Sequence, residues 1–103
     1  MRDMTSDGEI ALERVKSEAF GTLMSIQSYR TIDRAYFDRL RDAVSAAVAF
    51  FKDETEVPSE LIRELEGSAR VLRNEATAFP GRTAACMEMA EWLDTQSQQL
   101  RRA

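Results

Sequence analysis

Residues 58–81, with the sequence PSELIRELEGSARVLRNEATAFPG, contain the pattern that decides the fold. Apolar side chains recur in this stretch at spacings of three or four residues, at Ile62, Leu65, Ala69, Leu72, Ala76 and Phe79. This spacing places the side chains on one face of an α-helix. Pro58 suits the first turn of a helix, because the amide that proline lacks would have no partner there, and Pro80-Gly81 ends the helix. Two heptads are too few for a free-standing coiled coil, so other helices have to cover this seam.

The segment nearest the amino terminus predicts a helix from about Asp7 to about Tyr29. Ser6 and Glu9 have the spacing of a capping box, in which a serine hydroxyl and a glutamate carboxylate each bind a free amide at the helix start. The expected core stripe consists of Leu12, Val15, Ala19, Leu23 and Ile26, with Phe20 beside it. Residues 1–6 are expected to form a flexible tail.

A second helix is expected to begin at a cap, either Thr31 or Asp33, and to reach about Glu54. One apolar stripe consists of Phe37, Leu40, Val44, Ala47, Val48 and Phe51, and a second consists of Tyr36, Ala43 and Phe50. The stripes lie about 100° apart, so this helix needs cover on two sides. The link from Tyr29 to Asp33 contains no Gly or Pro, so a three-helix bundle with one long bent helix is the alternative fold.

A fourth helix is expected from about Arg82 to the carboxyl end. Its apolar side contains Cys86, Met89, Leu93 and Leu100. Gln96 and Ser97 interrupt that side, so the final turns are expected to pack poorly. Short connections between helices favour antiparallel neighbours. Residues 1–103 are therefore predicted to form one all-α domain, a four-helix, mostly antiparallel up-down bundle.

The composition excludes several classes of function. The chain has 103 residues, no histidine and one cysteine, Cys86. It therefore lacks the side chain best suited to proton transfer near neutral pH, and it cannot form an intrachain disulfide. No apolar run approaches the about 20 residues that cross a bilayer. We expect a cytoplasmic, non-enzymatic protein with no cofactor, no metal and no membrane span; an enzyme that uses paired carboxylates and a divalent cation is the third hypothesis.

Acidic side chains in the second half of the chain point to a partner. The net charge is −4, and the excess of acidic residues lies between residues 53 and 66. Glu56, Glu60 and Glu64 are predicted to dock a basic surface of another protein. The alternative is a solvated loop and helix start, where negative charge is locally favourable. Met87 lies off the apolar side of the fourth helix and is predicted to contact the same partner.

Two other groups of side chains suggest further contacts. Tyr36 and Phe50 would mediate a homodimer, unless their stripe packs within the chain. Arg30, Arg34 and Arg41 would follow a nucleic-acid backbone, although the acidic side chains between them favour internal ion pairs. The leading hypothesis is a small interaction module that binds and modulates another protein, and a nucleic-acid-associated regulator is the second hypothesis.

Overall fold

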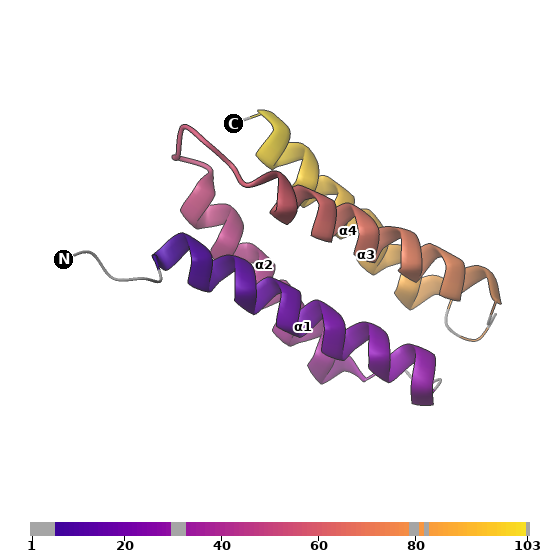
Figure 1. Cartoon of the computed structure of the whole chain (residues 1–103). Helices are drawn as coiled ribbons and strands as arrows, with labels where there is room; N and C mark the ends of the chain where they lie inside the picture. The colour runs from indigo at the N-terminus through magenta and orange to yellow at the C-terminus, as the bar shows by residue number, and fades with distance from the viewer. Residues whose placement is uncertain (1–5, 30–32, 79–80, 82, 103) are drawn as a thin grey trace.

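The computed structural model describes residues 6–29, 33–78, 81 and 83–102. Within these ranges it contains the helices α1 (Asp7–Tyr29), α2 (Arg34–Phe51), α3 (Ser59–Ala78) and α4 (Thr83–Arg102), and no strand. The helices pack side by side as an all-α four-helix bundle (Figure 1). The predicted fold class is therefore confirmed, and the three-helix alternative is wrong.

Local capping interactions explain where α1 and α2 begin. The Ser6 amide donates to Glu9 Oε1 at 3.2 Å, and the Glu9 amide donates to Ser6 Oγ at 3.1 Å, which confirms the capping box. Asp33 has an extended backbone, and its Oδ1 accepts from the amide of Ala35 at 2.9 Å. The other proposed cap, Thr31, and residues 1–5 of the expected tail lie outside the described residues.

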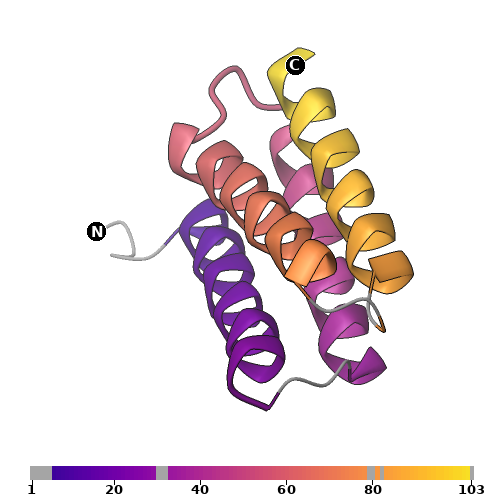
Figure 2. The same ribbon diagram turned by 90° about the vertical axis from the view of Figure 1, so that its right-hand side faces the viewer.

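The bundle consists of two helical hairpins, α1–α2 and α3–α4. Consecutive helices are antiparallel, as expected for short connections, and the two hairpins pack with α1 beside α3 and α2 beside α4 (Figure 2). The helices in each of these two pairs run in the same direction (Figure 1). Ion pairs cross both boundaries: Lys16 Nζ lies 3.5 Å from Glu60 Oε1, and Arg41 Nη2 lies 3.8 Å from Glu88 Oε1.

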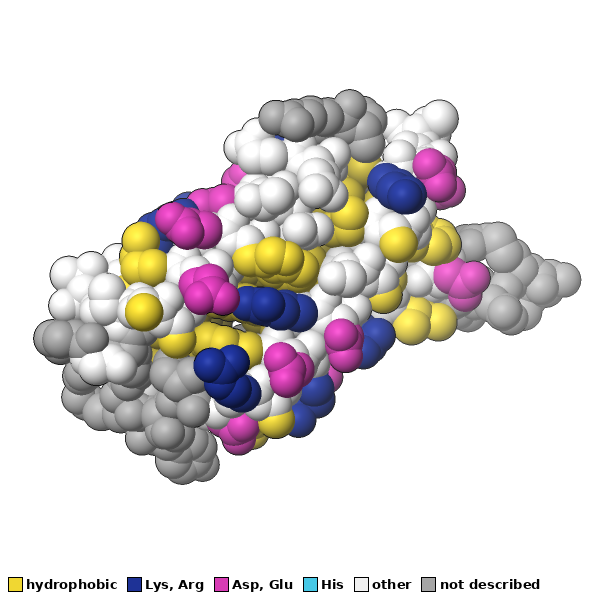
Figure 3. Space-filling view, turned by 180° about the vertical axis from the view of Figure 1, so that it is seen from behind, with side chains coloured by type: hydrophobic (Ala, Val, Ile, Leu, Met, Phe, Trp, Pro, Cys, Tyr) yellow, Lys and Arg dark blue, Asp and Glu magenta, His cyan; other side chains and the backbone are white. Residues whose placement is uncertain are grey.

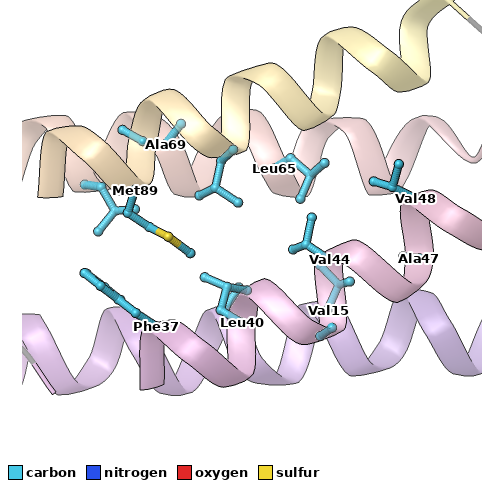
Figure 4. Packing of buried hydrophobic residues seen from close by; sticks show 14 of the residues in the cluster. Val15, Phe37, Leu40, Val44, Ala47, Val48, Leu65, Ala69 and Met89 are labelled. Carbon is cyan, nitrogen blue, oxygen red and sulfur yellow. The ribbon is translucent and has the colours of Figure 1, made fainter. Parts of the chain in front are cut away.

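Side chains from all four helices meet between the hairpins and form the core (Figure 4). The expected main stripe of α2 is buried along its whole length, and so are the four side chains expected on the apolar side of α4. Ser97 is only 1% exposed, and its hydroxyl donates to the carbonyl of Asp94 at 3.0 Å. The expectation that the last turns of α4 pack poorly is therefore wrong at Ser97, where a backbone partner satisfies the buried hydroxyl.

Helix α3 buries a wider arc than the heptad seam predicts. Leu61 is fully buried, whereas Ile62, which belongs to the expected seam, is only half-buried. The reason is that α3 contacts both α4 and α1, so side chains on two neighbouring sides are covered. The expected last member of the seam, Phe79, lies outside the described residues.

The difference between Leu61 and Ile62 can be measured. We expect Leu61→Ala to lower the free energy of unfolding by about 2–5 kcal/mol, because it leaves a cavity in a closed core. Ile62→Ala should cost less, because part of the isoleucine side chain already contacts water. Urea denaturation of both variants tests this order. A larger loss of unfolding free energy in Ile62→Ala than in Leu61→Ala would show that the heptad seam alone forms the buried face of α3.

Two glycines of α1 lie against aromatic side chains of α2 and should respond differently to substitution. A β-carbon at Gly21 would lie 3.4 Å from the Tyr36 ring, which is an ordinary contact, but one at Gly8 would lie 3.0 Å from the Phe51 ring. Gly21→Ala should therefore raise the free energy of unfolding by about 0.5–1 kcal/mol through helix propensity. Gly8→Ala should gain less or destabilise, because the Phe51 ring has to shift. Equal gains in thermal unfolding experiments would contradict this assignment.

Candidate functional site

Two large apolar side chains of α1 face solvent beside α3. Phe20 is 68% exposed and Met24 is 42% exposed, and the two residues are one helical turn apart. They line a groove of about 370 Å³. The other groove residues are Lys16, Leu23 and Gln27 from α1 and Glu64 from α3. We call this feature the α1–α3 groove; α1 and α3 are the two helices nearer the viewer in Figure 1.

Acidic side chains border the α1–α3 groove. Lys16 Nζ lies 3.4 Å from Glu13 Oε2 and 3.5 Å from Glu60 Oε1. The hydrogen bond to Glu13, followed by the charges of Glu13 and Glu60, raises the pKa of Lys16 above its ordinary value. Glu64 lines the groove and accepts a hydrogen bond from Ser68 Oγ at 3.5 Å. Three carboxylates against one ammonium group make this border net negative, and two of the three are the predicted docking residues Glu60 and Glu64.

No protein-family model, curated protein or solved structure matches this chain. The function of the α1–α3 groove is therefore inferred from its own side chains. From the sequence, Phe20 is expected beside the core stripe of α1, and neither Phe20 nor Met24 is predicted to belong to a binding surface. The signal in the sequence was the four-residue spacing between Phe20 and Met24. Residues four apart lie on the same side of a helix, and both of these lie off the main apolar stripe.

The remaining predicted partner-binding residues lie elsewhere. Glu56 is exposed in the connection before α3 and lines a separate pocket with Phe51, Val57 and Pro58. Met87 is half-buried and packs against the core, so only part of its side chain is available to a partner. The structure thus places Glu64 in the wall of the α1–α3 groove, Glu60 at its border through the ion pair with Lys16, and Glu56 and Met87 in other surroundings.

The two residues predicted to mediate a homodimer have partners within the chain. Tyr36 is half-buried, its ring lies against Gly21, and the guanidinium carbon of Arg39 lies 4.6 Å from the ring centre. Phe50 is partly exposed and packs edge-on against Phe51, with ring centres 4.9 Å apart. These contacts support the alternative that this stripe of α2 packs against α1. Self-association through Tyr36 and Phe50 stays a prediction.

Two of the arginines considered for nucleic-acid binding, Arg34 and Arg41, lie on the opposite face, between α2 and α4. Hydrophobic side chains reach the surface there, interrupted by charges of both signs (Figure 3). Arg41 lies 3.8 Å from Glu88, and its guanidinium carbon lies 5.6 Å from the centre of the Trp92 ring. Arg34 is exposed and lines the same pocket as Arg41 and Glu88, whereas Arg30 lies outside the described residues. This face has a mixed charge and is not a basic strip.

The described part of the chain shows neither a cluster of metal ligands nor a membrane-spanning helix. It contains no group of three or more Cys, Asp or Glu side chains that could hold a metal ion. Cys86 is fully buried in the core. None of the helices described combines the length and the apolar character required to cross a bilayer.

The raised pKa of Lys16 yields a prediction about the border of the groove. Glu13→Gln should lower the pKa of Lys16 more than Glu60→Gln does, because the hydrogen bond to Glu13 is the main cause of the shift. A side-chain NMR titration of Lys16 measures both effects. Since the pKa is raised on folding, the stabilisation is present below the unfolded-state pKa and is lost as the pH rises through the folded-state pKa. A larger effect of Glu60→Gln would assign the shift to the α3 carboxylate.

Proposed function

We propose that this chain is a small, cytoplasmic, non-enzymatic module that binds and modulates another protein through the α1–α3 groove. The observation that carries the proposal is the exposure of Phe20 and Met24 next to the carboxylates of Glu60 and Glu64. Single exposed apolar residues are normal on protein surfaces, but apolar side chains that line a groove with a polar border are typical of interaction sites. The mechanism would be occlusion of the partner's surface or scaffolding.

The free energies of burial and association indicate that the apolar side chains and the acidic border would have to act together in binding a partner. Full burial of a Phe or Met side chain contributes about 1.5–3 kcal/mol. Phe20 and Met24 gain less than this, because part of each side chain is already buried in the free chain. Association costs about 4–15 kcal/mol in lost freedom of motion, so these two side chains alone do not hold a partner. Glu60 and Glu64 would add charge-assisted hydrogen bonds to basic groups and would speed the encounter with a basic surface.

The surroundings of the arginines favour this function over nucleic-acid regulation. Of the arginines predicted to follow a nucleic-acid backbone, Arg41 lies 3.8 Å from Glu88 and 5.6 Å from the centre of the Trp92 ring, so this cation already has partners within the chain. A protein that neutralises phosphates needs several cations that are free to replace counterions. The net charge of −4 also opposes the approach of a nucleic acid.

Charge reversal on the two faces tests the proposal. The immobilised chain should capture a protein from native lysate, and the double variant Glu60→Lys/Glu64→Lys should lose it, because a basic partner would then meet like charge. Capture should weaken as salt rises, since the Debye length falls from about 10 Å at 0.1 M to about 3 Å at 1 M. The bound protein is quantified by mass spectrometry, and circular dichroism checks that the variants fold.

Two matched charge reversals serve as controls. Glu91→Lys changes an exposed residue of α4 and should leave capture intact. Arg34→Glu on the α2–α4 face should also leave it intact. If Arg34→Glu instead abolished binding of a nucleic acid while Glu60→Lys/Glu64→Lys preserved it, the nucleic-acid alternative would replace the proposed function.

A further inference from the structure

The α1 wall of the α1–α3 groove is long enough for about three turns of a helix to lie along it. This wall extends from Lys16 to Gln27, which corresponds to about 16 Å along a helix at 1.5 Å per residue. Phe20, Met24 and Gln27 follow one another along this wall at spacings of four and three residues, which recur on one face of a helix. A partner helix lying in such a groove presents its own apolar side chains at the same spacings over about three turns.

The walls of the groove disfavour an extended partner. Both walls are helices, whose interior amides and carbonyls already bond to one another within the helix. An extended peptide gains affinity mainly by bonding its main chain to the open edge of a sheet, and no sheet occurs in the described ranges. A segment buried in this groove therefore has to satisfy its own backbone groups, and a helix does so.

The charge of the border selects the partner's chemistry. The ammonium group of Lys16 lies between Glu13 and Glu60, and Glu64 adds a further negative charge beside the apolar floor. The net negative border is complementary to Lys and Arg side chains. A second copy of this chain would bring the same border against itself in a twofold contact, and two net negative borders repel.

We propose that the α1–α3 groove binds an amphipathic helix of the partner protein. Its apolar face covers Phe20 and Met24, and its Lys or Arg side chains meet Glu60 and Glu64. This inference rests on the proposed function and adds the partner's secondary structure, its charge and the residues that anchor it.

Synthetic peptides test the inference with the purified full chain. The probe is a Leu/Lys peptide of about 15 residues, long enough to form a helix, with its leucines on one helical face. One comparison peptide has the same composition in an order that gives no apolar face, and another has Glu in place of Lys. Calorimetry should show one-to-one binding of the amphipathic basic peptide, and both comparison peptides should bind at least about tenfold more weakly.

Variants of the chain locate the binding. Phe20→Ser should weaken binding of the amphipathic basic peptide by at least about tenfold, as expected for an anchoring aromatic residue. Ile10→Ser is the matched control, because Ile10 is also an exposed apolar residue of α1 but does not line the groove. Glu60→Lys/Glu64→Lys should weaken binding of the amphipathic basic peptide and strengthen binding of the acidic comparison peptide.

The outcomes separate this inference from the proposed function. If the native partner is lost in Glu60→Lys/Glu64→Lys but retained in Phe20→Ser, the protein-binding function stands and the helix-in-groove inference is wrong. Equal binding of the ordered and reordered Leu/Lys peptides, no binding of either, or equal effects of Phe20→Ser and Ile10→Ser would also overturn it. A dimer in sedimentation experiments that Phe20→Ser dissociates would show that a second copy covers the groove instead.

Discussion

The apolar contact between the two hairpins is the interaction on which the rest of the structure depends. Val15, Leu40, Leu65 and Met89 come from four different helices and meet in one core, so neither hairpin buries its apolar side chains alone. This contact places α1 beside α2 and α3 only, among the described helices. The apolar surface of α1 is wider than these two neighbours cover, and Ile10, Phe20 and Met24 are left exposed.

The spacing of residues along the chain predicted those features of the fold that depend on a single helix. The main stripe of α2 and the capping box of Ser6 and Glu9 were predictable because each is set by residues close together in the chain. The burial of Leu61 was not, because it depends on α3 touching α1 as well as α4. The sequence also did not predict which helices of the two hairpins lie side by side, since no short connection joins α1 to α3 or α2 to α4.

The sequence predicted several residues of the candidate site separately, but it did not predict that they lie close together. The acidic stretch identified Glu60 and Glu64, and the α1 pattern placed Phe20 beside its stripe. Whether a residue beside a stripe is covered depends on which helix lies next to it, and that is decided by packing between hairpins. Similarly, Arg34 and Arg41 were predicted to belong to a basic strip, but the fold placed Glu88 of α4 within ion-pair distance of Arg41.

The position of the α1–α3 groove links binding to the stability of the bundle. The ion pair between Lys16 and Glu60 crosses from one hairpin to the other at the edge of the groove, but exposed pairs of this kind contribute only about 0–1 kcal/mol. A ligand that contacts both α1 and α3 would bridge the same boundary with a larger buried surface. Because the groove exists only when the hairpins are packed together, such a ligand would stabilise the folded bundle by an amount that, well above its Kd, grows with the logarithm of its concentration. Occupancy of the groove and association of the hairpins are therefore thermodynamically coupled.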